Sequence, residues 1–341
     1  MENHGGVRRS ARALGVLVVV LLAGCSSASS GGASTTVPAP TPTTITTTSI
    51  GPTTTTLPAV PASTGCGEAP AIDGLTKDGP GDVALTFESG GVQRSYRLAV
   101  PDDYDQDTPA PLILNLHGSG SNAVQQSIYS DLPRQAAARG MLTITPDAIA
   151  ANWQLGATGT DDDFLVALVR SVEDQYCIDL DQVDVAGLSL GSWKAAVMVC
   201  VHPDTFAAAG LVAVEVHPNV CPAKPVIAFH GTADHVVPYG EGADPGVVVT
   251  GFNADLPGAH QNMAAWAKAA GCEAQQDVNK IGSDVELWTY PGCDAGVDVQ
   301  LYTVVHGDHT WPGSKITIGP TTHTIDATKL ILDFFEAHRM T

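Results

Sequence analysis

The sequence predicts an α/β fold with a mostly parallel central sheet and helices on both of its faces. Short apolar runs, typical of buried strands, alternate along the chain with segments whose apolar residues recur at helical spacing. A Gly-x-Ser-x-Gly stretch at 187–191 lies between one such run and the helix expected after it. In sheets of this kind, sites lie at the carboxyl ends of the strands, so the catalytic residues are expected in the loops there.

The expected elements follow one another in a regular order. A half-buried strand over 94–100 alternates polar and apolar residues. A helix over 131–139 would carry Pro133 in its first turn and Gly140 at its end. The acidic triplet 161–163 precedes apolar residues at i, i+4 and i+8, which suits the N-terminus of an amphipathic helix. The other expected strands are 112–116, 142–145, 183–186, 209–214, 226–229, 285–290 and 299–305, and the other helices are 193–201, 259–270 and 327–338.

The charge balance excludes several classes of partner. The 341 residues include 36 acidic and 16 basic side chains, for a formal net charge of -20. Such a chain has little with which to neutralise phosphates, so we expect no nucleic-acid partner. Outside the extreme N-terminus no apolar run is long enough to span a bilayer. We therefore expect that the catalytic body does not lie in the membrane, and we also expect a monomer.

The N-terminus has the pattern of an export signal. Arg8, Arg9 and Arg12 precede a short apolar stretch over 14–22, which ends in Leu-Ala-Gly before Cys25. Small residues before a cysteine resemble the bacterial lipobox, in which that cysteine is lipidated. An ordinary signal peptide with an incidental cysteine is the alternative. The lipobox reading predicts an extracytoplasmic protein, bound to the outer face of the cell membrane only through its lipid anchor.

The segment after Cys25 is unlike the rest of the chain. Residues 26–64 contain thirteen Thr, six Pro and no charged side chain. Such a composition offers too little apolar surface to fold and favours extended conformations. The sequence thus predicts a signal peptide over 1–24, a lipidated, disordered Thr/Pro-rich stalk over 25–65 and a catalytic domain over 66–341.

The remaining cysteines predict disulfides. An even number in an exported chain indicates three bridges, although fifteen pairings are formally open. No two have the C-x-x-C spacing of zinc or redox sites, so we expect no metal. From their places beside expected elements, we hypothesise the pairs Cys66–Cys177, Cys200–Cys221 and Cys272–Cys293.

Three loops at strand ends carry the residues of a catalytic triad. Ser189 occupies the centre of the Gly-x-Ser-x-Gly turn, where a strained strand-to-helix connection would expose its hydroxyl. Asp234 follows the 226–229 strand, and His309 follows the 299–305 strand, with His306 as its rival. The order Ser, Asp, His is that of the α/β-hydrolases. A helix N-cap serine and a turn aspartate are the structural alternatives.

The expected chemistry needs further groups around the serine. A tetrahedral oxyanion requires two N–H donors, for which we predict the backbones of Leu190 and of Ser119 in the Gly-rich loop after the 112–116 strand. Trp153 and Trp311 are candidates for contact with an acyl or aryl group, although tryptophan is more often a packing residue. His117 and His230 are interpreted as structural histidines at strand ends.

Five ordered segments resemble the polyhydroxybutyrate depolymerase and feruloyl esterase group of secreted α/β-hydrolases. They are RLAVP at 97–101, LHGSG at 116–120, DVAGLS at 184–189, HGTAD at 230–234 with VPY at 237–239, and HTWPG at 309–313. The resemblance runs from about Cys66 to the C-terminus and implies ester hydrolysis without a cofactor. The chain departs from the group's usual pattern at Ser119, where Cys is common, and at Ser192 and Asp308, where Gly is common.

These observations predict a serine esterase that hydrolyses short acyl or aromatic esters, like polyhydroxybutyrate depolymerases or feruloyl and acetylxylan esterases. No long apolar lid segment lies between Gly191 and Asp234, which argues against a long-chain lipase. The alternatives are a serine peptidase of the same fold and a non-catalytic lipoprotein that binds its ligand at the cell surface.

Overall fold

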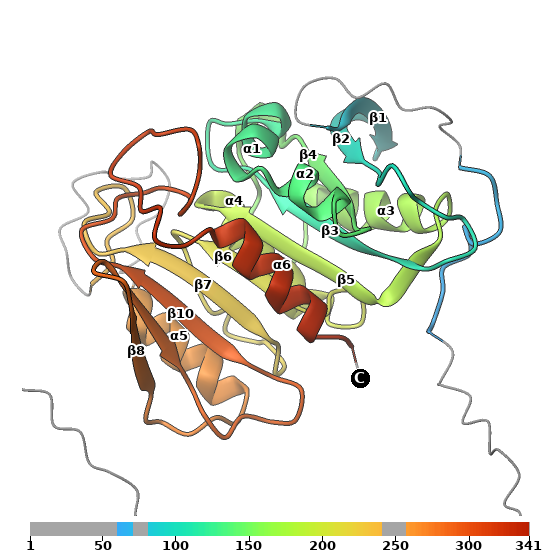
Figure 1. Cartoon of the computed structure of the whole chain (residues 1–341). Coiled ribbons are helices and arrows are strands. Elements are labelled where there is room, and N and C mark those ends of the chain that lie inside the picture. Colours follow the sequence, from blue (N-terminus) through green and yellow to red (C-terminus); the bar gives the residue numbers. More distant parts are fainter. Residues whose placement is uncertain (1–59, 71–80, 241–256, 341) are drawn as a thin grey trace, which may run out of the picture. The chain divides into compact units, whose positions relative to one another are not determined.

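A ten-stranded sheet organises the part of the chain that the structure, a computed structural model, describes: residues 60–70, 81–240 and 257–340 (Figure 1). Its strand order is β1-β2-β4-β3-β5-β6-β7-β10-β9-β8. The strands are β1 Val83–Ser89, β2 Val92–Ala99, β3 Ala110–Leu116, β4 Leu142–Pro146, β5 Ile178–Leu188, β6 Ala209–Val212, β7 Val226–Gly231, β8 Asp277–Ile281, β9 Val285–Thr289 and β10 Val299–Val304.

The centre of the sheet is parallel and its two margins are antiparallel. Strands β4, β3, β5, β6, β7 and β10 pair in parallel, whereas β1 and β2 at one margin and β9 and β8 at the other pair antiparallel. Every residue of β4, β6 and β7 is buried, as expected for strands covered on both faces. Edge strand β8 is largely exposed and polar, which limits pairing with other chains. The prediction of a mostly parallel sheet is confirmed.

Helices cover both faces of this sheet. The helices are α1 Ala123–Ser130, α2 Leu132–Ala137, α3 Thr160–Glu173, α4 Leu190–Val201, α5 Ala259–Ala269 and α6 Ala327–Ala337, with a short 3-10 turn η1 at Ile149–Ala151. Apolar residues of α3, α4 and α5 share one core cluster, and those of α2 and α6 share a second. Successive residues of β3 alternate between the clusters, with Leu112 and Leu114 in the first and Ile113 in the second. Two separate cores therefore hold the sheet between them.

The expected helix over 131–139 is the clearest difference from the sequence analysis. Two helices, α1 and α2, meet at Asp131, whose backbone adopts the left-handed conformation with φ 54°. Pro133 lies in the first turn of α2, as expected. Helix α1 is capped at its N-terminus by Asn122, whose side chain accepts a hydrogen bond from the Gln125 N–H at 2.9 Å. Val124 of α1 is exposed, which weakens the amphipathic pattern from which this helix could have been predicted.

The three disulfides are those hypothesised: Cys66–Cys177, Cys200–Cys221 and Cys272–Cys293. The first fastens an amino-terminal clasp, residues 61–66, to the start of β5. Within this clasp Ala62 pairs antiparallel with Asp179, and the Ser63 N–H donates to the Ile178 carbonyl at 2.9 Å. The last residues of the expected stalk are therefore part of the fold.

Several sequence predictions lie outside the described residues. These are the signal peptide over 1–24, the lipidation site Cys25 and the stalk up to residue 59. Among the described helices, none has the length and apolar character needed to cross a bilayer.

Candidate active site

The carboxyl ends of β5, β7 and β10 meet at one edge of the sheet. A continuous register crosses β5, β6, β7 and β10 near these ends. Ser189 follows β5 directly, and Asp234 and His309 lie in the loops after β7 and β10. The topology thus brings the three predicted triad residues to a common edge.

Ser189 occupies a sharp turn between β5 and α4. Its backbone has φ 56° and ψ -119°, which is strained for a residue with a side chain. The neighbouring glycines make this turn sterically feasible: a Cβ on Gly187 would lie 2.4 Å from the Gly191 backbone, and a Cβ on Gly191 would lie 2.2 Å from the Leu116 carbonyl oxygen. The Ser189 side chain makes no N-cap hydrogen bond, so the hydroxyl is not engaged in capping α4. Ser189 thus holds the N-cap position of α4 without capping the helix through its side chain.

The predicted oxyanion donors flank this turn. Leu190 is the first residue of α4, so its N–H has no acceptor within the helix. Gly118 lies against the turn, because a Cβ built there would be 3.4 Å from the Ser189 Cβ. Ser119 follows it, and the Ser119 hydroxyl donates to Asn152 Oδ1 at 2.5 Å. The loop after β3 is thus held beside the serine.

Asp234 and His309 form a hydrogen-bonded pair. His309 Nδ1 lies 2.7 Å from Asp234 Oδ2, and the Asp234 side chain is fully buried. The other carboxylate oxygen accepts the N–H groups of Val236 and Val237, both at 2.8 Å. No hydrogen bond between Ser189 Oγ and His309 is present among the described residues. Such bonds are often long in unliganded enzymes.

Asp308 connects the loops that carry these two residues. Its Oδ1 accepts from the His309 N–H at 2.7 Å and lies 2.5 Å from His235 Nδ1. His306, the rival for the base, lies beyond the end of β10, and its N–H donates to Thr232 Oγ1 rather than bringing the ring to Asp234. His309 is the histidine that the fold pairs with the aspartate.

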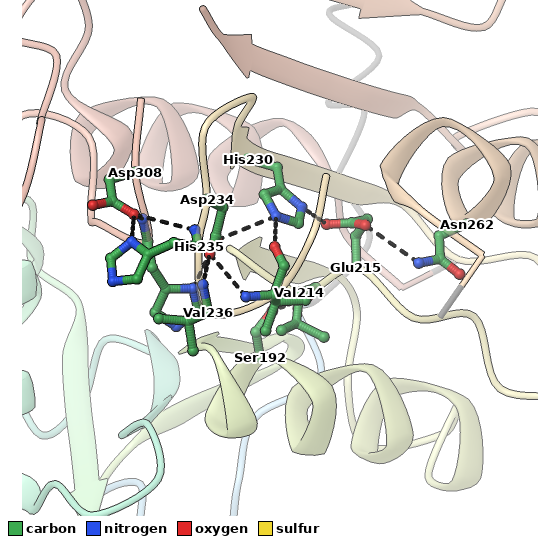
Figure 2. Close-up of polar contacts among 11 residues, drawn as sticks. Ser192, Val214, Glu215, His230, Asp234, His235, Val236, Asn262 and Asp308 are labelled. Carbon is green, nitrogen blue, oxygen red and sulfur yellow. Dashed lines mark hydrogen bonds and ion pairs between the residues drawn. The ribbon is translucent and has the colours of Figure 1, made fainter. Parts of the chain in front are cut away.

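A second imidazole reaches Asp234 from another direction. His230 Nε2 lies 3.3 Å from Asp234 Oδ2 and 3.0 Å from the Val237 carbonyl oxygen. His230 Nδ1 lies 2.8 Å from Glu215 Oε2, and Glu215 Oε1 accepts from Asn262 at 3.2 Å (Figure 2). The described residues contain no group of three or more His, Cys, Asp or Glu side chains arranged to hold a metal ion.

The electrostatics of this chain of contacts favour alternating charges. Burial alone would lower the pKa of His230, but Glu215 and Asp234 outweigh it and raise that pKa to about 10. Burial alone would raise the pKa of Asp234, but its hydrogen bonds to His230 and His309 hold the pKa well below its usual range. Sequence reasoning treated His230 as merely structural and missed Glu215. The available signal was that His230 lies near the end of the strand that leads into the Asp234 loop.

The two candidate substrate-binding tryptophans lie inside the protein. Trp311 is 1% exposed, belongs to the second core cluster and donates its indole N–H to Thr328 Oγ1 at 2.9 Å. Trp153 is 4% exposed and donates to the His117 carbonyl at 2.9 Å. Neither ring is free to bind a substrate in this structure, so both are assigned to packing instead.

Comparison with known proteins shows that this chain is similar to esterases. Residues 95–229 match the family model described as Esterase PHB depolymerase. Feruloyl esterase B of Piromyces equi is 29% identical over 65% of this chain, which spans only 44% of that protein. The putative esterase NocK of Nocardia uniformis subsp. tsuyamanensis is 28% identical over 97% of this chain and 98% of its own length.

A solved structure shows the same fold. The acetyl xylan esterase from Aspergillus awamori superposes with a TM-score of 0.52, at 15% identity, over 75% of this chain and 99% of that one. At 15% identity this match supports only the architecture of the fold. Together the comparisons confirm the resemblance drawn from the sequence and the α/β-hydrolase fold.

Proposed function

We infer that this chain, a carboxylic ester hydrolase related to the polyhydroxybutyrate depolymerase and feruloyl esterase group, is a serine esterase that uses Ser189, His309 and Asp234. The observation that carries the proposal is the buried Asp234–His309 pair, held at the same sheet edge as the strained Ser189 turn. A turn of this kind keeps a nucleophile exposed, and the pair supplies an oriented base.

The proposed reaction has two halves. Ser189 Oγ attacks the ester carbonyl carbon while His309 Nε2 takes the hydroxyl proton, and Asp234 stabilises the resulting imidazolium. The oxyanion is bound by the backbone N–H groups of Leu190 and Ser119. The tetrahedral intermediate then collapses, and His309 gives its proton to the departing alcohol. Water, activated by His309, next cleaves the acyl-enzyme to release the acid and restore Ser189.

Covalent labelling tests the nucleophile. Ser189→Ala should abolish both ester turnover and labelling by a fluorophosphonate probe. Ser171→Ala is the matched control, because this serine lies on α3 and only accepts a hydrogen bond from Gln175. Wild-type protein that neither reacts with the probe nor hydrolyses any ester would support the non-catalytic binding lipoprotein instead.

We propose short acyl or aromatic esters as substrates. Between α4 and Asp234 the chain contains only β6, β7 and their connections, so no lid helix is inserted there. The feruloyl and acetyl xylan esterases named above fit this size of acid. A panel of nitrophenyl esters, methyl ferulate, acetylated xylan, hydroxybutyrate oligomers and peptide amides should show fastest turnover of the short esters. Preference for acyl chains of about twelve carbons would indicate a lipase, and amide cleavage a peptidase.

We further propose that the protein works as a monomer outside the cytoplasm, attached to the membrane through a lipid on Cys25. Three disulfides in the described residues fit an oxidising compartment. Cys25→Ser should release the protein into the medium or block its processing, as membrane fractionation would reveal. Retention of this variant on membranes would contradict the lipid anchor.

A further inference from the structure

Asp234 has more partners than a catalytic triad requires. Its buried carboxylate accepts two backbone N–H groups and the His309 ring, and a second ring, that of His230, lies on the same oxygen as His309. A triad needs the first imidazole only. The second therefore calls for its own explanation.

The contacts of His230 define its protonation state. Nε2 faces the Val237 carbonyl and the Asp234 carboxylate, and Nδ1 faces the Glu215 carboxylate. A carbonyl and ionised carboxylates only accept hydrogen bonds, so both ring nitrogens must carry a proton to satisfy them. The ring and the Glu215 side chain are at most 2% exposed, which leaves no room for bulk water to replace these partners.

We propose that Glu215 and His230 are positioning residues for catalysis: a buried ion pair whose positive end, the His230 ring, holds the Asp234 carboxylate at the same oxygen that His309 contacts. The proposal rests on the esterase function proposed above. In Figure 2 His230 lies between Asp234 and Glu215, with Asn262 beyond Glu215. The pair thereby links the loop after β6, strand β7 and helix α5 to the catalytic aspartate.

Other ionisable groups around His230 are uncharged near neutral pH. The Tyr239 ring packs edge-on against His230 at 5.4 Å, and burial raises the pKa of Tyr239 to about 12. The Tyr239 hydroxyl contacts Thr303 of β10 and His260 of α5, and burial lowers the pKa of His260. The charges that face His230 are thus Glu215 on one side and Asp234, with His309 behind it, on the other.

This arrangement has a predictable effect on pH dependence. His230 and His309 share Asp234 Oδ2, so their nearest nitrogens are no more than about 6 Å apart, whereas Glu215 lies on the far side of the His230 ring. The nearer positive charge opposes protonation of the base. Removing both charges should move the acid limb of the kcat/KM profile to higher pH, by about half a unit at an effective dielectric constant near 20.

The first test needs no variant and no substrate. In the ¹⁵N-labelled wild-type protein at pH 8, the His230 ring should show two protonated nitrogens in imidazole NMR spectra. A singly protonated ring at that pH would overturn the ion pair. This result is independent of folding defects in any variant.

The second test uses the double variant Glu215→Gln/His230→Gln, which keeps the buried polar shapes without charge. We expect its acid limb to shift as stated and its kcat to fall with little change in KM. Asp161→Asn is the matched control, since it removes a buried carboxylate that pairs with Arg94 at 2.8 Å elsewhere in the fold, and its limb should coincide with wild type. A double variant whose profile coincides with wild type would overturn the proposal. Full activity of Ser189→Ala would instead refute the serine esterase function and leave the NMR result standing.

Discussion

Trp311 is the residue at which the structure changes an expectation most sharply, and replacing it gives a quantitative test. The indole is 1% exposed, and its N–H is bonded to Thr328. The backbone N–H of Trp311 also donates to the Tyr129 hydroxyl at 3.0 Å. Removing a buried tryptophan side chain costs about 3–5 kcal/mol. Since domains of this kind are stable by about 5–15 kcal/mol, Trp311→Ala should lose at least about a fifth of the total.

The assay is urea denaturation at fixed pH, alongside steady-state kinetics of the folded protein. The midpoint should fall for Trp311→Ala with little change in slope. Trp311→Phe keeps most of the ring but loses the donor to Thr328, so it should cost only about 1–2 kcal/mol. KM should stay near wild type in both variants. An alanine variant of wild-type stability with a raised KM would show that the ring contacts substrate and would refute the assignment to the core.

The remaining predictions concern covalent links, pH and the loop contact at Asp308. Replacing both Cys66 and Cys177 by Ser should destabilise the fold by about 5 kcal/mol, because this disulfide closes a sequence separation of 111. Removing either of the other two disulfides, whose separation is 21, should cost about 3 kcal/mol. Equal losses in calorimetry without reductant would contradict this. Because the pKa of His230 is raised from 6.5 to about 10, its contribution to stability is complete below about pH 6.5 and is lost as pH rises through 10. Between pH 7 and 10 the urea midpoint should therefore fall less in His230→Gln than in the wild-type protein. Asp308→Asn should lower the free energy of unfolding by at most about 1 kcal/mol, since the His235 side chain that pairs with Asp308 is 68% exposed. Asp308→Gly also removes the acceptor of the His309 backbone N–H, so it should lower kcat more than Asp308→Asn does. Equal kcat values in the two variants would contradict this.

The sequence could predict the parts of the fold that local chemistry determines. Buried strands and the Gly-x-Ser-x-Gly turn have strong local patterns, and the carboxyl-edge rule then locates Asp234 and His309. The break at Asp131 lacked such a signal, because a left-handed residue without glycine between two short helices leaves little trace in the sequence. Strands β1 and β8 were also missed: β8 is exposed and largely polar, whereas β1 does alternate Val83, Leu85 and Phe87 with more exposed residues, a pattern from which it could have been predicted.

The rest depends on contacts between distant residues. Trp311 lies two positions from His309, yet the turn after the histidine directs the indole into the core beside α6. Glu215 reaches His230 only because β6 and β7 are neighbours in the sheet. Sequence proximity to a catalytic residue is therefore a poor guide to which side chains surround it.

The clasp at residues 61–66 has a mechanical consequence. A pull applied to the chain before residue 60 would reach Cys66 and pass through its covalent bond to Cys177, directly into the start of β5. The 110 residues between these cysteines, which include β1 to β4 and α1 to α3, lie outside this covalent path, and the clasp reaches them only through hydrogen bonds, such as those to Glu173 and Tyr176. Ser189 lies at the opposite end of β5, beyond the eleven residues of the strand. A protein tethered at its N-terminus could thus be strained by flow or by a moving wall while the loop beside its nucleophile, in the bypassed segment, stays relaxed.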